Sequence, residues 1–159
     1  AKYCITSLQS FLDPRVKVKV YTDQPHEWMQ GNNWQNLILE AECPDLTKFK
    51  KRNGHRPVPG GSKGFTKDGV RFAHKSYAWC HAAEHCDTDV LMWLDADSEV
   101  LDHLGLGYLG NFMQDGYVSS YLGREGRFTE TGWLGFNMQH PDIKRFIKRI
   151  KQYLSLIHI

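Results

Sequence analysis

The feature that most constrains the fold is an unbroken apolar run, Val90–Leu94, that ends directly in Asp95-Ala96-Asp97. Five consecutive apolar residues are typical of a strand that is covered on both faces, as in the middle of an α/β sheet. Two carboxylates at positions i and i+2 of an extended segment point the same way. Because ligands of open α/β sheets bind beyond the carboxyl ends of the strands, the pattern predicts a central strand with a polar site at its end.

This pair of carboxylates can share a hard divalent cation. Mg²⁺ and Mn²⁺ prefer oxygen ligands, and proteins often hold them with one or two carboxylates while substrate phosphates supply further oxygens. Asp95 and Asp97 are therefore candidate metal ligands. The alternative is a polar turn that ends the strand and binds nothing.

The rest of the chain alternates between helical and strand patterns, which favours one layered α/β domain with helices on both sheet faces. Thr66 can cap the helix before the apolar strand, with Asp68 in its first turn. The run 34–39 is ambiguous between helix and strand. We expect helices over residues 3–12, 66–86, about 101–113 and from Pro141 onward, and strands over 16–21, 117–122 and 132–138.

Composition excludes several classes of protein. The chain is 41% hydrophobic and 24% charged, which is average for a soluble globular domain and argues against disorder. A formal net charge of +2 is too small to indicate a nucleic-acid partner. No run approaches the roughly 20 apolar residues that a membrane span needs.

The cysteines and the chain ends add two expectations. Four scattered cysteines without close pairs favour reduced thiols and an intracellular, cytoplasmic setting. We interpret residues 1–153 as the domain and the apolar string 154–159 as a tail, non-native or artefactual.

Residues 48–67 are basic and rich in glycine and proline, which predicts a long surface loop. Loops of this length within compact domains are uncommon and often functional. The segment is either a solvated surface loop or a mobile flap that attracts phosphates and closes over a ligand.

On Trp93-Leu94-Asp95-Ala96-Asp97-Ser98 the chain resembles the glycosyltransferases of the GT-A fold, whose signature is an apolar strand that ends in Asp-x-Asp. The resemblance extends unevenly from Val16 to about Tyr153 and includes glycogenin-like members and bacterial and phage-type transferases. It implies a three-layer α/β/α fold and metal-dependent transfer of a sugar from a nucleotide-diphosphate donor to a carbohydrate or other hydroxyl acceptor. It further implies that Asp97 ligates Mn²⁺ or Mg²⁺ directly, that Asp95 binds metal or ribose, and that Ala96 belongs to the same donor-binding segment.

The same resemblance assigns expectations to residues on other elements. Arg71 and Lys75 are placed to face the diphosphate, Arg71 as a planar fork and Lys75 as a point charge, although a solvated helix face is equally consistent with them. Asp23 closes a strand where related folds contact the base. The segment with Glu130, Thr131, Gly132 and Asn137 is similar to the part that shapes the donor-sugar and acceptor pocket.

Two of those assignments have open alternatives. Glu130 is a candidate general base or a holder of an acceptor hydroxyl, and otherwise a solvated loop carboxylate. Asn137 is a candidate ligand for a sugar hydroxyl, and otherwise a cap at a strand end.

The chain departs from the GT-A pattern at both ends. The resemblance implies that the first strand of the fold precedes Ala1, and that a third metal ligand, commonly a histidine, follows Ile159. By this interpretation the chain is a fragment that lacks its first strand and its C-terminal part. It can be inactive even where its parent is an enzyme.

Other functional classes remain open from the sequence. Haloacid-dehalogenase-like phosphatases also place Asp-x-Asp after an apolar strand, with the first Asp as nucleophile. Their motif usually continues with Thr or Val, whereas Glu99 stands at that position here. A non-catalytic sugar- or nucleotide-binding module and a metal-dependent nucleotidyltransferase are the further alternatives.

Overall fold

The structure is a computed structural model that describes residues 1–26, 33–55, 68–113, 115–126 and 130–156. Its helices are α1 (Lys2–Phe11), α2 (Leu39–Glu42), α3 (Pro44–Asn53), α4 (Gly69–Glu84), α5 (Leu106–Phe112) and α6 (Ile143–Leu156). Its strands are β1 (Val18–Thr22), β2 (Trp34–Ile38), β3 (Val90–Leu94), β4 (Ser119–Leu122) and β5 (Glu130–Asn137).

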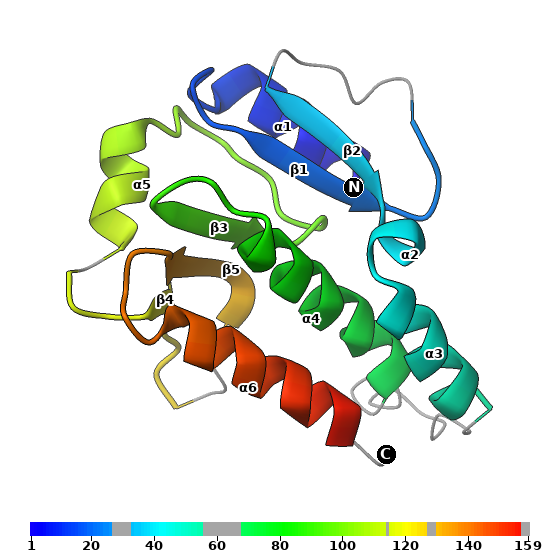
Figure 1. The fold of residues 1–159 in the computed structure, drawn as a ribbon. Helices are drawn as coiled ribbons and strands as arrows, with labels where there is room; N and C mark the ends of the chain where they lie inside the picture. The colour runs from blue at the N-terminus through cyan, green and yellow to red at the C-terminus, as the bar shows by residue number, and fades with distance from the viewer. Residues whose placement is uncertain (27–32, 56–67, 114, 127–129, 157–159) are drawn as a thin grey trace.

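Helices lie on both sides of the strands, as the alternating pattern predicts. In Figure 1, α1 lies behind β1 and β2, whereas α4 and α6 lie in front of β3 and β5. The ambiguous run 34–39 supplies β2, which pairs with β1 in parallel. The expected α/β architecture is therefore present.

The position of β3 differs from the expectation of a central strand. Among the described residues the strands form a parallel pair, β1–β2, and a three-stranded sheet in the order β3-β5-β4. The second sheet is antiparallel, with β5 in its centre and β3 at one edge. The prediction that Val90–Leu94 is central is wrong because the apolar run reflects cover on both faces and not the number of neighbouring strands.

That cover comes from two hydrophobic clusters. One joins α2, α3 and α4 around Leu46 and Phe49, which are 0% and 1% exposed. The other joins α4, β5 and α6 around Cys80 and Phe136. Trp93 of β3 packs against both clusters, and Leu91, on the same face of the strand, packs against the second. On the opposite face, Met92 lies with Phe112 and Met113 around Gly135, so both faces of β3 meet apolar side chains.

The predicted loop 48–67 is partly helical, which corrects that expectation. Residues up to Asn53 belong to α3, which begins at Pro44, a residue favoured at the first helical position. Leu46 and Phe49, three residues apart, give the helix a buried side that the many lysines conceal in the composition. Residues 56–67, which carry the rest of the proposed flap, lie outside the described residues.

Helix α4 begins three residues later than predicted. Its N-cap is Asp68, whose Oδ1 accepts a hydrogen bond from the Arg71 backbone N–H at 2.9 Å. Asp68 therefore caps the helix instead of lying in its first turn. Thr66, the expected cap, is outside the described residues.

Helix α6 does not end where the predicted domain ends. It continues to Leu156, and Leu154 is only 6% exposed, so the boundary at residue 153 does not coincide with the end of an element. All four cysteines are free thiols, in agreement with the expected reduced state. Among the described helices, none combines the length and the hydropathy that crossing a membrane requires.

Helix α1 holds the loop that follows β3. The Ser7 hydroxyl donates to the Cys4 carbonyl at 2.9 Å and accepts from the Val100 N–H at 3.0 Å. Farther along, the Leu104 N–H donates to the Phe11 carbonyl, and the Asp13 N–H donates to the Leu104 carbonyl. The loop that carries the two aspartates is thus attached to α1 at several points.

We expect Ser7→Ala to lower the free energy of unfolding by about 1–3 kcal/mol, because it leaves the Val100 N–H without its partner in a largely buried setting. Urea denaturation followed by circular dichroism measures the change. Ser10→Ala is the control on the same helix, since Ser10 is exposed and donates only to the Thr6 carbonyl. Equal effects of the two substitutions would contradict the proposed attachment.

Candidate active site

The two aspartates lie in a β-turn directly after β3. The Ser98 N–H donates to the Asp95 carbonyl at 3.0 Å, which closes the turn. The sequence argument assumed that this segment is extended, whereas the structure shows a turn. Asp95 is partly buried, whereas Ala96 and Asp97 are exposed. The turn presents Asp97 to solvent and keeps Asp95 against the protein.

The start of β5 lies beside this turn. Leu94 pairs with Trp133 in the antiparallel register, and the Asp95 N–H donates to the Gly132 carbonyl at 2.8 Å. Thr131 and Gly132 are thus next to Asp95, although more than thirty residues separate them in the sequence. The observed register therefore brings the start of this segment, and not its other end at Asn137, to Asp95.

Lys75 of α4 links these two elements through its ammonium group. Its Nζ lies 2.7 Å from Asp95 Oδ2, 2.6 Å from the Thr131 carbonyl oxygen and 3.3 Å from Thr131 Oγ1. The Lys75 side chain is 17% exposed and the Asp95 side chain 31%, so water screens this ion pair only in part. Helix α4, the end of β3 and the start of β5 therefore converge on one cation.

Two indole rings complete the surroundings of that cation. Lys75 Nζ lies 5.4 Å from the centroid of Trp79 and 5.9 Å from that of Trp93, distances typical of cation–π contacts. The indoles themselves pack edge to face at 5.9 Å. Trp93 also donates its Nε1–H to Asp95 Oδ1 at 2.6 Å. Both oxygens of Asp95 thus accept a hydrogen bond from the protein.

The role of Trp93 escaped the sequence analysis, which treated the residue as part of an apolar run. A signal was present, because residues i and i+2 of a strand lie on the same face and Trp93 precedes Asp95 by two. An indole N–H on the same face as a carboxylate is a natural hydrogen-bond donor to it.

The sulfur of Cys4 lies near the turn, 3.8 Å from the Asp95 carbonyl oxygen. Burial raises the pKa of the Cys4 thiol, and the charges of Asp97 and Asp95 raise it further, against the opposing effect of the terminal ammonium. The thiol is therefore protonated at neutral pH. It packs against the site without competing as an anionic ligand.

Arg71 lies one turn before Lys75 on α4 and is exposed. Residues four apart on a helix lie on the same side, so α4 presents an exposed guanidinium next to the half-buried ammonium. Glu130 forms the first residue of β5 and precedes Thr131 directly. The backbone of Glu130 is thus close to the cluster, and its side chain lies outside what the structure describes.

Two predicted site residues stand apart from this cluster. Asn137 pairs with Val90, which lies at the opposite end of β3 from Asp95, about 16–17 Å along the strand. Its Oδ1 accepts from the Gln139 N–H at 3.0 Å, so it caps the strand end. Asp23 follows β1 and is exposed. Strands β1 and β3 point the same way in Figure 1, so Asp23 belongs to the same end of the strands but to the separate two-stranded sheet.

The carboxylate oxygens at this turn could hold a cation only together with oxygens from a bound ligand. Among the described residues, no group of three or more His, Cys, Asp or Glu side chains is arranged to hold a metal ion. Asp97 has no protein hydrogen bond within the described part of the chain, whereas both oxygens of Asp95 accept one. A single available carboxylate suits Mg²⁺ or Mn²⁺ when substrate phosphates supply the remaining oxygens.

A comparison with family models gives one match. The model of Glycosyl transferase family 2 matches residues 68–158, more than half of the chain, from the N-cap of α4 through α6. The matched segment contains Lys75, both aspartates and Thr131. The chain belongs to glycosyl transferase family 2, and it is thereby placed among the transferases that use nucleotide-sugar donors.

Neither the curated proteins nor the solved structures show a significant match to the chain.

We expect Lys75→Met to lower the free energy of unfolding by about 1–3 kcal/mol, because it leaves Asp95 and the Thr131 carbonyl without their donor in a partly buried place. Thermal or urea denaturation measures the loss. Lys151→Met is the control, since Lys151 pairs with Glu84 where both side chains are over 40% exposed. An effect below about 0.5 kcal/mol at Lys75, the level of an exposed pair, would contradict this account of the cluster.

Proposed function

We propose that the cluster at the end of β3 binds a nucleotide-diphosphate sugar and directs transfer of its glycosyl group to a carbohydrate or other hydroxyl acceptor. The observation that carries the proposal is the convergence of Lys75, Asp95 and Thr131 beside the exposed Asp97. The family supplies the class of reaction. The residues named below are assigned by this proposal.

Asp97 is the residue that would hold Mn²⁺ or Mg²⁺, because it alone of the two aspartates is without a protein donor within the described residues. Such an ion supplies Lewis-acid stabilisation to a leaving diphosphate. Asp95 keeps further lone pairs on both oxygens and can accept a ribose hydroxyl while Lys75 and Trp93 fix its orientation. The two carboxylates therefore have different tasks.

Lys75 and Arg71 supply the remaining positive charge. Breaking the bond between the anomeric carbon and the phosphate oxygen leaves negative charge on the diphosphate, and fixed cations stabilise that charge. Lys75 is already oriented by two oxygens and two indoles, so little reorganisation is needed when the donor binds. Arg71, exposed on the same side of α4, is available for a bidentate contact with phosphate oxygens.

Glu130 and Thr131 are assigned to the acceptor and sugar side of the proposed site. The support is the position of their backbone, since the Gly132 carbonyl is bonded to Asp95 and Glu130 lies two residues before it. The carboxylate of Glu130 would take the proton of the attacking hydroxyl or orient that hydroxyl.

The family match also bears on the rival phosphatase mechanism. A haloacid-dehalogenase-like enzyme would use Asp95 as a nucleophile. The segment that contains both aspartates instead matches the model of Glycosyl transferase family 2. The family match therefore favours glycosyl transfer.

We expect Asp97→Asn to weaken metal-dependent donor binding about 10- to 100-fold, since it removes the charged oxygen ligand. Isothermal titration calorimetry with a panel of nucleotide-diphosphate sugars, with and without MnCl₂, measures the affinity. Asp102→Asn, in the same loop and exposed, is the control and should bind normally. Donor binding that persists unchanged in excess chelator would sink the metal assignment.

We expect Glu130→Gln to lower glycosyl transfer by about 100-fold or more while leaving metal-dependent donor binding nearly intact. Turnover of the donor in the presence of acceptor mixtures, alongside calorimetry, separates the two effects. Glu125→Gln, a nearby exposed carboxylate, is the control. Loss of donor binding in Glu130→Gln would instead assign this residue to donor binding.

A further inference from the structure

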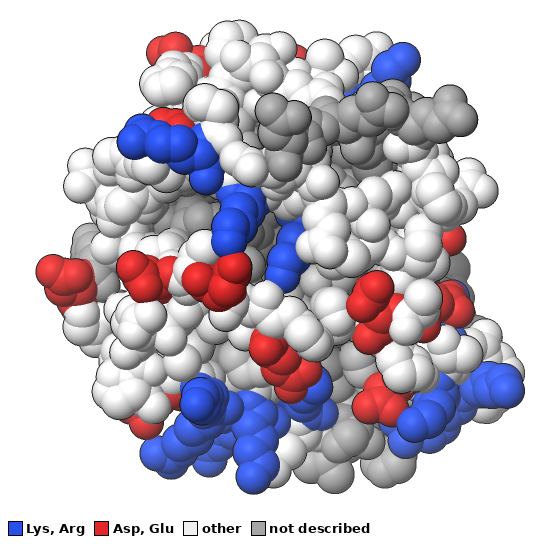
Figure 2. Space-filling view, turned by 45° about the horizontal axis from the view of Figure 1, so that its top comes forward, with Lys and Arg blue, Asp and Glu red and all other residues white. Residues whose placement is uncertain are grey.

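Helix α6 carries a concentration of positive charge that the proposed active site does not use. Lys144, Arg145, Lys148 and Arg149 are all exposed. None of the four has a hydrogen bond or an ion pair within the described residues. In Figure 2, a group of Lys and Arg side chains lies at the lower left, on the side of the molecule where α6 runs in Figure 1.

The pairing of α6 charges contrasts with that of α3. On α3, Lys48 pairs with Asp45 and Lys50 pairs with Glu40. Figure 2 correspondingly shows carboxylates among the cations at its lower right. Neutralising the four α6 cations would make the formal net charge of the chain, +2, negative. Helix α6 therefore carries four exposed cations without carboxylate partners among the described residues.

The geometry of α6 separates its two faces. Ile143 and Ile147 are 5–6% exposed and pack in the cluster with α4 and β5, and Leu154 is 6% exposed. At about 100° per residue, the four cations span an arc of roughly 140° that is centred opposite those apolar residues. Lys151, which pairs with Glu84 of α4, further attaches the helix to the protein. The cationic face is consequently held outward by a rigid scaffold.

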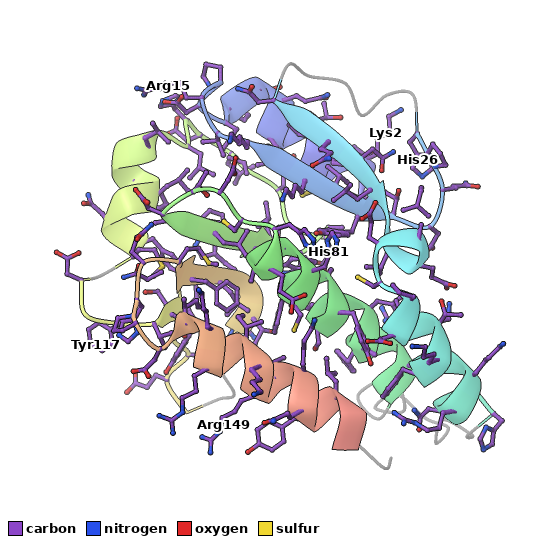
Figure 3. All side chains as sticks on the ribbon, viewed as in Figure 1. Lys2, Arg15, His26, His81, Tyr117 and Arg149 are labelled. Carbon is purple, nitrogen blue, oxygen red and sulfur yellow. The ribbon has the colours of Figure 1, made fainter. Side chains whose placement is uncertain are left out.

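Exposed tyrosines accompany this face. Tyr153, four residues after Arg149, is 63% exposed, and Tyr117 is 60% exposed. Figure 3 places Tyr117 and Arg149 on the same lower side of the molecule. Val118, next to Tyr117, packs against the cluster that holds α6. Tyrosine with an apolar ring and a polar tip is favoured at the level of lipid headgroups.

We propose that the face formed by Lys144, Arg145, Lys148 and Arg149 docks this protein on an anionic phospholipid surface. Clusters of four or more Lys or Arg on an amphipathic helix are typical of binding to anionic lipid headgroups, and the exposed Tyr153 beside them suits the same interface. Each Lys or Arg near an anionic leaflet contributes a small, additive attraction. Since the apolar face of α6 is used in the core, the attachment is peripheral and electrostatic.

Sedimentation with lipid vesicles tests the proposal on the full chain. We expect binding to vesicles of phosphatidylcholine with 30% phosphatidylserine at 0.1 M NaCl, and strong weakening at 0.5 M NaCl because surface charges are then screened. The double substitution Lys148→Gln, Arg149→Gln should lower the partition coefficient about 30-fold. The pair Lys51→Gln, Arg52→Gln on α3 removes the same charge and should change it much less.

Several outcomes would overturn the proposal. These are equal binding to vesicles of phosphatidylcholine alone, equal loss in the α3 and α6 variants, and tight binding of heparin or polyuridylate by a protein that ignores anionic vesicles. The last result would assign the face to a soluble polyanion. Circular dichroism melting of both variants shows that the fold is unchanged, as expected for exposed side chains. None of these measurements depends on glycosyl transfer.

Discussion

The Lys75 ammonium is the point on which the arrangement of the site depends. It is held by Asp95 Oδ2, by the Thr131 carbonyl and by two indole rings, so that one charge fixes α4, the end of β3 and the start of β5 relative to one another. A lysine side chain loses considerable conformational freedom when it is ordered in this way. The several simultaneous contacts offset that cost, and they give the site a cation whose position is set before any ligand arrives.

The loop that carries Asp97 depends on a different part of the chain. Its contacts with α1, through Ser7, Phe11 and Asp13, come from residues that precede the segment matched by the family model. The match begins at Asp68, yet the acidic turn is bordered by Cys4 of α1. The N-terminal helix therefore contributes to the geometry of the site without supplying a ligand to it.

Much of the fold was predictable because periodicity records which faces are covered. The apolar run at β3, the alternation at β1 and the amphipathic pattern of α6 each predicted the correct type of element. Strand order was not predictable. Apolar contacts on both faces give β3 the composition of a central strand, although β5 occupies the centre. Helix α3 was missed for a similar reason, since Leu46 and Phe49 are few among many lysines.

The candidate site shows the same division. Local spacing identified Asp95 and Asp97, and the family resemblance pointed to Lys75. Only tertiary structure could show that Lys75 reaches Asp95 across twenty residues. Asn137 was grouped with Thr131 because the two share a strand. The antiparallel register separates them, since one end of β5 meets Asp95 and the other meets Val90. Only one end of β5 lies at the site. Residues at its other end are near in sequence but far from the site in space.

The distribution of charge separates two kinds of surface on the same pair of packed helices. On α4, the site cation Lys75 is half-buried and paired, which fixes its position and makes it suited to a defined ligand. On α6, the outward cations are exposed and unpaired within the described residues, which leaves them mobile and suited to a surface without fixed geometry. The pair Lys151–Glu84 joins the two helices. A protein docked through α6 would therefore hold the cluster around Lys75 in a constant orientation to the surface it binds.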